Sequence, residues 1–425
     1  MIATLFIAFA VLLAIGMPVA FATGLATLIV LLVEPSLSFR ILITKAFSGM
    51  DSFPLMAIPF FILAGEIMAK SGMTERIVNL ASAIVGHIRG GLAHVNVLAN
   101  MLMSGVSGSA AADCAATGSI LIPAMVKQGY KPDFSALVTA FAAMMGPMIP
   151  PSIFMIIYGS IANVSIGALF LGGIIPGVLI GVSLMTLIAI LVRRESYAVP
   201  RSRFSWAVLR SSTIAAGWAL AMPVLIVGGI LGGFMTPTEA GIVAVVYSLL
   251  IGMVFERTIK FADLRGIIMD ASIMSANVMM LIAFAAGFGT VLTLGRFDDA
   301  IIGILFSITD QPWLIVTMII LALAVIGGIM DEIATAILFV PSLAIIGTKL
   351  GYDPVHFGVV MVLAVLIGAV VPPVATLLFI GCSIARIPLS AIMKLVWIFL
   401  IPLFAVTFLI AFMPPLVTAI PRMFF

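Results

Sequence analysis

A short polar stretch, MSGVSGSAAAD from Met103 to Asp113, interrupts a chain that is apolar on both sides. It offers hydroxyls from Ser104, Ser107 and Ser109, two glycines and one carboxylate. Such oxygens, together with free backbone carbonyls, are suitable ligands for a hard cation such as Na⁺. A carboxylate placed within an apolar segment indicates a functional site by default. We therefore predict a cation site around Asp113.

A second aspartate lies in a related context in the other half of the chain. DCAATGSILIP, from Asp113, matches DEIATAILFVP, from Asp331, at a spacing of 218 residues. Further on, GPMIPP from Gly146 matches GAVVPP from Gly368 at a spacing of 222 residues. Because Asp, Gly and Pro carry the match, we interpret it as an internal repeat that places the two aspartates at equivalent positions. The alternative role of each Asp is to cap a half-helix, which is compatible with holding an ion.

Each half also contains a long apolar segment that Pro-Pro interrupts, at 134–171 and at 357–384. A proline removes one backbone donor and obstructs the carbonyl one turn earlier. It also displaces the preceding residue from the α region. We predict two helices broken within the membrane, with free carbonyl oxygens; a simple kink is the alternative. The N-terminus of a half-helix suits an anionic substrate group.

Composition defines the elements that must position these residues. The chain is 63% hydrophobic and only 9% charged, whereas soluble domains carry about 25% charged residues. This predicts an all-α polytopic membrane protein, because an apolar run of roughly 20 residues crosses a bilayer. Some runs are shorter, so we expect about ten to twelve crossings and two re-entrant hairpins, at about 90–126 and 313–346.

The halves are separated by an arginine-rich loop, RRESYAVPRSRFSWAVLR, at 193–210. The positive-inside rule places this loop in the cytoplasm. We divide the chain into a first repeat half at 1–192, a connecting region with scaffold helices at 193–266, and a second repeat half at 267–425. The apolar run at 2–33 is expected to form one membrane segment.

The motifs favour a secondary transporter, which combines a repeat pair with discontinuous helices. The sequence contains no G-x-x-x-x-G-K-[ST], so it does not support an ATP-driven pump. The net charge of +3 does not indicate nucleic-acid binding. An enzyme is disfavoured, because the aspartates lack the contexts of intramembrane aspartyl proteases and GVSGS falls one residue short of G-x-S-x-G. A passive scaffold subunit would not explain costly polar sites in both halves.

Three stretches, SGVSGSAAADCAATGSILIPAM, GPMIPPS and GAVVPPVAT, resemble the large membrane subunit of tripartite ATP-independent periplasmic (TRAP) transporters. The resemblance covers nearly the whole chain. It implies a multi-pass secondary transporter of the bacterial inner membrane that imports an organic anion, with Na⁺ as the coupling ion and no other cofactor. It also implies an elevator mechanism, in which a transport domain of two hairpins and two broken helices slides against a scaffold.

The resemblance also implies partners. A soluble periplasmic binding protein delivers the substrate, and a small four-helix membrane subunit pairs with the large one in the lipid bilayer. Sialic acid is the preferred substrate, with C4-dicarboxylates as a second option. A receptor-independent sodium/anion symporter of similar architecture is the alternative function.

The resemblance implies two Na⁺ sites and a set of substrate contacts. The first Na⁺ site comprises Ser104, Ser107, Ser109, Asp113, Gly146 and Pro150. The second comprises Gly327, Gly328, Asp331, Gly368, Val371 and Thr376. The second tip, IGGIMDE, has no serine, so its site relies on carbonyls and Thr376. The candidate substrate contacts are Ser107, Asn163, Arg296 and Arg386. The alternative role of Arg296 is a salt bridge to Asp298 or Asp299, or an interfacial position.

Overall fold

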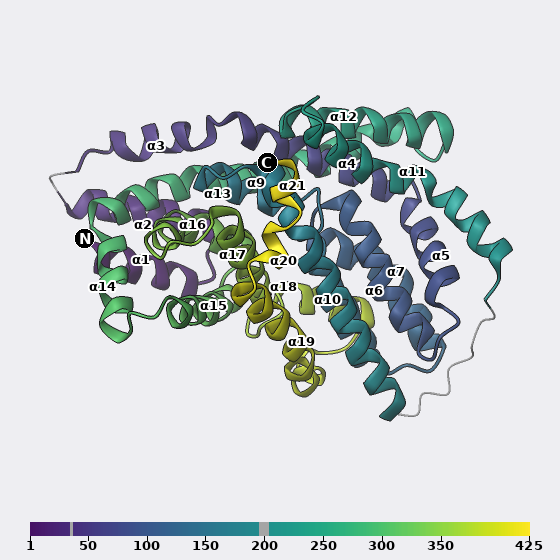
Figure 1. The fold of residues 1–425 in the computed structure, drawn as a ribbon. Coiled ribbons are helices and arrows are strands. Elements are labelled where there is room, and N and C mark those ends of the chain that lie inside the picture. The colour runs from purple at the N-terminus through teal and green to yellow at the C-terminus, as the bar shows by residue number, and fades with distance from the viewer. Residues whose placement is uncertain (35–36, 195–203) are drawn as a thin grey trace.

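The computed structural model describes residues 1–34, 37–194 and 204–425, and every regular element in these ranges is helical (Figure 1). Eight described segments are long and apolar enough to cross a membrane: Phe53–Lys70, Ile166–Arg194, Trp206–Leu231, Pro237–Phe255, Phe261–Leu294, Pro312–Ile329, Glu332–Lys349 and Met393–Phe412. The predicted all-α fold is confirmed. Half of the expected arginine-rich loop, 195–203, lies outside the described residues, and its two ends belong to Ile166–Arg194 and Trp206–Leu231. Its cytoplasmic location stays a prediction.

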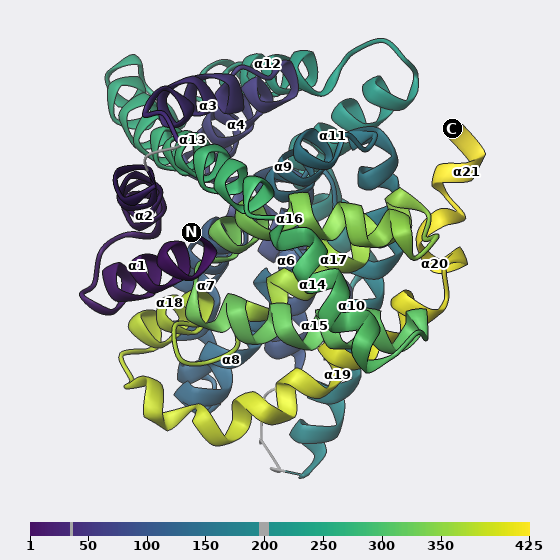
Figure 2. The ribbon, with the colours of Figure 1, turned by 90° about the vertical axis from the view of Figure 1, so that its left-hand side faces the viewer.

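One group of helices, here called the frame, packs along one side of the molecule. In Figures 1 and 2 α3 lies along α13 and α12 lies along α4, and α13 also packs on α4. The frame consists of α2 (Val19–Val33), α3 (Arg40–Met50), α4 (Ala57–Lys70), α5 (Met73–Val85), α11 (Trp206–Leu231), α12 (Pro237–Leu249) and α13 (Leu264–Leu294). The short 3-10 helices η1 (Phe53–Met56) and η3 (Phe261–Asp263) adjoin these helices, and the π-helix η2 (Leu250–Phe255) continues α12.

The run at 2–33 was expected to form one segment, and this expectation is wrong. It forms α1 (Ile2–Ala14) and then α2, with a turn between them. Gly16 in this turn has φ +84, a left-handed conformation that glycine adopts without steric cost. Pro18 then precedes the first residue of α2 and cannot donate a helix hydrogen bond.

The first half builds a hairpin and then a broken helix, as predicted. The hairpin is α6 (Gly91–Ser107) and α7 (Ala110–Lys127), and the broken helix is α8 (Pro132–Ala143) and α9 (Ile153–Ala162). The expected range of 134–171 extended too far, because Asn163 ends α9 at φ 54. The chain then enters α10 (Ile166–Arg194), a separate long helix.

The second half repeats this order. Its hairpin is α15 (Pro312–Ile329) and α16 (Glu332–Lys349), and its broken helix is α17 (Pro354–Gly368) and α18 (Thr376–Ala385). The remaining helices are α14 (Phe297–Ile308), η4 (Leu389–Ala391), α19 (Met393–Phe412), α20 (Pro415–Thr418) and α21 (Pro421–Phe424).

The helix ends correct the register of the repeat. Ser107 and Ile329 end the first arms of the two hairpins, 222 residues apart, and both second arms are 18 residues long. At this spacing Ser109 is equivalent to Asp331, so Asp113 and Asp331 are not equivalent. The match at 218 residues is displaced by four residues, about one helical turn. A four-residue shift keeps side chains on the same helix face, which explains why the sequence match looked continuous.

The two halves interlock through their broken helices. The piece α9 of the first half packs on α16 of the second, while α18 packs on α7 and α8. A Cβ added at Gly381 of α18 would lie 2.9 Å from the Ala136 carbonyl oxygen of α8. Helices α8 and α17 are buried on nearly all faces, which explains their continuous apolar sequence. The hairpins and broken helices therefore form one packed unit, here called the inner unit (α6–α9 and α15–α18).

Candidate functional site

The tip of the first hairpin is a turn of two residues, Gly108 and Ser109. Gly108 has φ +63, and an added Cβ would lie 2.6 Å from the Pro151 carbonyl oxygen. Only glycine fits this close approach. Ser109 is the N-cap of α7, and its hydroxyl accepts a hydrogen bond from the Ala112 amide at 3.4 Å. The sequence thus turns the chain sharply against the first broken helix.

Asp113 lies one turn inside α7 and is completely buried. The Ser107 hydroxyl donates to Asp113 Oδ1 at 2.5 Å and accepts from the Ser109 amide at 3.2 Å. The other carboxylate oxygen, Oδ2, has no hydrogen-bond partner among the described residues. Because a buried polar atom without a partner is destabilising, this oxygen is the strongest candidate ligand for a cation.

The first broken helix presents its non-helical backbone to the same tip. Pro150–Pro151 is a cis peptide, and α9 starts afresh after Ser152. The Ser152 hydroxyl donates to the Pro147 carbonyl and accepts from the Met155 amide at 3.1 Å. A Cβ added at Gly146 would lie 2.7 Å from Asp113 Oδ2. Gly146 therefore brings backbone close to the unpaired oxygen.

The structure separates the predicted residues of the first site. Ser107, Ser109 and Asp113 line one small cavity of about 30 Å³. Ser104 is buried nearby, but its hydroxyl donates to the Asn100 carbonyl within α6. The Pro150 carbonyl oxygen faces Gly105, 3.6 Å from the position of an added Cβ. Ser104 and Pro150 are therefore neighbours of this cavity and do not line it.

The second tip is built on the same plan with different side chains. A Cβ added at Gly368 would lie 2.4 Å from the Gly327 backbone, so the two backbone segments are in direct contact. The Gly328 carbonyl accepts from the Val374 amide at 2.8 Å. A Cβ added at Gly328 would also lie 2.9 Å from the Val371 carbonyl oxygen. The backbone of the second tip thus lies against the backbone of the second break, around the cis peptide Pro372–Pro373.

The carboxylates of the second tip already have protein donors. Asp331 is the N-cap of α16 and accepts from the Ala334 amide at 3.4 Å. Glu332 is buried, and the Thr376 hydroxyl donates to its Oε2 at 3.3 Å. The capping role considered from the sequence therefore applies to Asp331, whereas in the first half Ser109 performs it.

A buried network of hydrogen-bonded polar side chains lies behind the first tip, and it was not predicted from the sequence. The Asn100 side chain donates to Asn96 Oδ1 at 2.9 Å and accepts from the Thr117 hydroxyl at 3.1 Å. The Asn96 amide donates in turn to the Thr139 hydroxyl at 2.6 Å. Thr117 also donates to the Asp113 carbonyl at 2.6 Å. The four-residue spacing of Asn96, Asn100 and Ser104 on an apolar helix was the available signal.

The predicted substrate residues do not meet at the first tip. Asn163 and Arg386 are the C-caps of α9 and α18, with φ 54 and 56. Arg296 is the N-cap of α14, with φ 55, and makes no ion pair within the described ranges. Asn163 lines a cavity of about 510 Å³. Of the four predicted substrate residues, Ser107 is therefore the one that lies at the first tip.

A second large cavity lies between the frame and the inner unit. It has a volume of about 470 Å³, with Lys45 and Thr290 on the frame and Ser160 on α9 among its lining residues. Ser160 and Ser52 line both this cavity and the one at Asn163. Volumes of this size are typical of small-molecule sites.

Comparison with known proteins identifies the family. Residues 6–416 match the family described as "Tripartite ATP-independent periplasmic transporter, DctM component". The sialic acid TRAP transporter large permease protein SiaM of Vibrio cholerae is 35% identical, over 96% of each chain. The C4-dicarboxylate TRAP transporter large permease protein DctM of Pseudomonas aeruginosa is 36% identical, over 93% of this chain and 92% of that one. The isethionate TRAP transporter permease protein DctMQ of Oleidesulfovibrio alaskensis is 38% identical, over 98% of this chain and 65% of that one.

A solved structure shares the fold. The YdaH transporter of Alcanivorax borkumensis has a TM-score of 0.63 and 15% identity, over 88% of each chain. The predicted TRAP resemblance and the inner-membrane location are confirmed by the family match and the relatives. The chain therefore belongs to the DctM family, the large multi-pass permeases of tripartite ATP-independent periplasmic transporters, and it is a transport protein for organic acids and not an enzyme.

Proposed function

We propose that this permease couples the import of an organic anion to Na⁺, and that the first hairpin tip holds the coupling ion. The observation that carries the proposal is the buried, unpaired Oδ2 of Asp113 beside the hydroxyls of Ser107 and Ser109. Oxygen ligands of this kind suit a hard cation. A repeat pair of broken helices is the usual setting for such a site in secondary transporters.

A second Na⁺ site is proposed at the second tip, with different ligands. Its candidate oxygens are the backbone carbonyls of Gly327, Gly328, Gly368 and Val371 and the hydroxyl of Thr376. Asp331 supports this site by capping α16. Because Thr376 and the acids already bond to protein groups, we assign this site the weaker affinity.

The proposed mechanism is an elevator, in which the inner unit moves against the frame. The interlocking of α9 with α16 and of α18 with α7 and α8 makes the inner unit suitable to move as one body. The cavities of about 470 and 510 Å³ lie where this unit meets other helices. We propose that the organic anion passes through them, with Lys45 and Asn163 available to its carboxylate.

The substrate and partners follow from the relatives. Their names include sialic acid and C4-dicarboxylate, so we propose an organic acid of this range, with sialic acid first. We also propose a periplasmic binding protein and a small membrane subunit as partners, in keeping with a tripartite transporter.

A disulfide tests the elevator, because Ser52 of the frame side and Ser160 of α9 lie with their hydroxyl oxygens 3.0 Å apart. A Ser52→Cys, Ser160→Cys pair, in a background with Cys114 and Cys382 replaced by alanine, should lock the two parts together. We expect oxidation to abolish Na⁺-driven uptake in proteoliposomes and a reductant to restore it. Either single variant is the control; full uptake in the oxidised pair would contradict the elevator.

The coupling ion is tested by uptake in proteoliposomes that contain this permease, its small subunit and its binding protein. A Na⁺ gradient should drive accumulation of the acid, and a K⁺ gradient of equal ionic strength should not. Accumulation without Na⁺ would contradict the proposed coupling.

A further inference from the structure

Glu66 is a carboxylate of α4 without an assigned role. Lys70 lies one turn further along α4, in the position that favours an i, i+4 ion pair. It instead pairs with Asp270 of α13, at 2.8 Å. Among the described residues the side-chain carboxylate of Glu66 has neither a hydrogen bond nor an ion pair. An uncompensated carboxylate on a membrane-spanning helix is costly, which makes it a candidate for function.

Glu66 lines the same small cavity as Asp113, whose Oδ2 has no hydrogen-bond partner among the described residues. This cavity of about 30 Å³ has Gly65 and Glu66 of α4 on one wall, and Ser107, Ser109 and Asp113 on the other. A space of this size accommodates about one water molecule or one small ion. Among the described residues its acidic lining consists of Glu66 and Asp113, which belong to two different parts of the protein: α4 in the frame and α7 in the inner unit.

The backbone of α4 lies directly on the tip. A Cβ added at Gly65 would lie 3.5 Å from both the Cα and the carbonyl oxygen of Ser107. Glu66, the next residue, is only partly buried. Glu66 is thus placed at the edge of the tip and is partly accessible, whereas Asp113 is enclosed.

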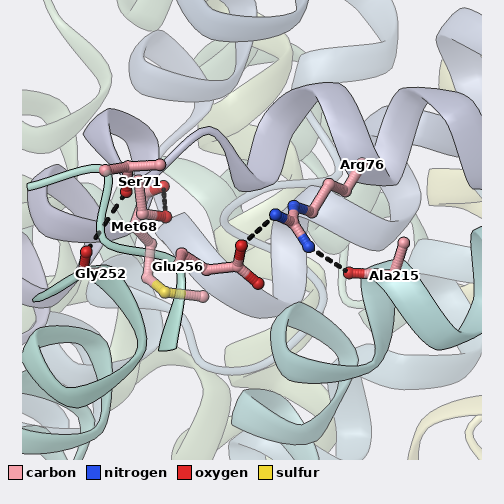
Figure 3. A network of polar contacts seen from close by, with 7 residues as sticks. Met68, Ser71, Arg76, Ala215, Gly252 and Glu256 are labelled. Carbon is pink, nitrogen blue, oxygen red and sulfur yellow. Dashed lines mark hydrogen bonds and ion pairs between the residues drawn. The ribbon is translucent and has the colours of Figure 1, made fainter. Parts of the chain in front are cut away.

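The corner after α4 is anchored to the rest of the frame, as Figure 3 shows. Arg76 of α5 forms an ion pair with Glu256 and donates to the Ala215 carbonyl of α11 at 3.2 Å. Ser71, at the end of α4, donates to the Met68 carbonyl at 2.6 Å. These contacts hold the start of α5, whereas α4 itself packs on α12 and α13 and is joined to α13 through the Lys70–Asp270 ion pair. Glu66 therefore belongs to the frame, against which the inner unit is proposed to move.

We propose that Glu66 is a cation ligand supplied by the frame, which holds the coupling ion together with Asp113 as the ion enters or leaves the first tip. The ligand is a monovalent alkali cation, coordinated by two carboxylates and the neighbouring serine hydroxyls. The inference rests on the proposed Na⁺ coupling. It also explains a difference between the halves, because the second tip carries its own second carboxylate, Glu332.

The test is Na⁺ binding to the purified full-length chain in detergent, followed as the Na⁺-induced rise in melting temperature. Choline keeps the ionic strength constant, and K⁺ is the ion control. We expect Glu66→Gln to raise the Na⁺ concentration for half-maximal stabilisation about tenfold, which is in the range for loss of one supporting group at a metal site. Glu66→Asp, which keeps the carboxylate, should retain most of the response. Glu75→Gln, at an exposed site on α5, is the matched control and should leave it unchanged.

The outcomes separate this inference from the proposed function. An unchanged Na⁺ response in Glu66→Gln, with or without a lower melting temperature, overturns the role of Glu66 and leaves the Na⁺ coupling intact. Absence of a Na⁺-specific response in the wild-type chain overturns both. If Glu66→Gln folds poorly, Glu66→Ala is a second uncharged variant, and its Na⁺-induced rise in melting temperature is interpreted in the same way.

Discussion

At the first hairpin tip the carboxylate of Asp113 lies one turn inside α7 and is completely buried, whereas at the second tip Asp331 stands at the end of α16 and caps it. The two tips have connections of equal length and face equivalent broken helices. In the first, a serine performs the capping. The carboxylate is thereby released from the helix end and placed against Gly146.

This difference shows that one backbone design can serve two levels of cation affinity. At the first tip one carboxylate oxygen has no donor among the described residues. At the second tip Asp331 and Glu332 each accept a hydrogen bond from the protein. A cation at the second tip therefore competes with existing bonds, while a cation at the first satisfies an oxygen that is otherwise unpaired. Substitutions at equivalent places of the two tips test this contrast.

The sharpest contrast is between the two aspartates. We expect Asp113→Asn to raise the Na⁺ concentration for half-maximal uptake about 100-fold, or roughly 2.8 kcal/mol, because it removes the charge beside the ion. Asp331→Asn should change it less than about threefold, since Asn caps a helix as well as Asp. Uptake in proteoliposomes, measured against Na⁺ concentration, gives the half-maximal concentration for each variant. Equal losses in both variants would mean that the two tips bind alike.

Alanine substitutions at the two glycines of the breaks, Gly368 and Gly146, should have different effects on stability and on Na⁺ binding. Gly368→Ala forces a Cβ to within 2.4 Å of the Gly327 backbone, so we expect a stability loss of about 1–3 kcal/mol. Gly146→Ala meets the Asp113 carboxylate first and should mainly weaken Na⁺ binding. Thermal melts with and without Na⁺ separate the two effects. If Gly146→Ala lowers the melting temperature but leaves the Na⁺-induced rise unchanged, Gly146 is not part of the cation site.

The hydroxyls provide a smaller contrast. Ser107→Ala removes a 2.5 Å bond to a carboxylate, worth about 1.5 kcal/mol and hence about tenfold in Na⁺ affinity. Thr376→Val removes a 3.3 Å bond and should cost about threefold at most. Ser104→Ala is the control, because its hydroxyl serves the helix backbone. The comparison fails if Ser104→Ala lowers Na⁺ affinity as much as Ser107→Ala does.

The smallest effects are expected at the starts of α9 and α18. Ser152→Ala removes an N-cap and should lower stability by about 1 kcal/mol. Ala375 has φ 44 and no capping side chain, so Ala375→Gly should raise stability by about 0.5 kcal/mol. Melting temperatures in detergent measure both changes, and the Na⁺ response should not change in either. A stabilised Ser152→Ala variant would contradict the capping role.

Much of the architecture could be predicted from the sequence because polarity in a membrane is rare and therefore informative. Pro150 and Pro151 predicted the break between α8 and α9, and the serines and glycines of 104–109 predicted the tip. The prediction was less accurate where apolar residues continue through a boundary. The end of α9 at Asn163 and the division of 2–33 depend on single residues with unusual backbone angles.

The all-α fold, the two hairpins, the two breaks and the family could be predicted from residue types alone, because composition, proline and rare polar residues act locally. The register of the repeat required the folded structure, since a four-residue shift keeps side chains on the same helix face and leaves the sequence match intact. The packing also brings α9 and α18 against helices of the opposite halves, and places Glu66 of α4 and Asp113 in the lining of one cavity. These are contacts between distant segments, and they depend on how whole helices pack.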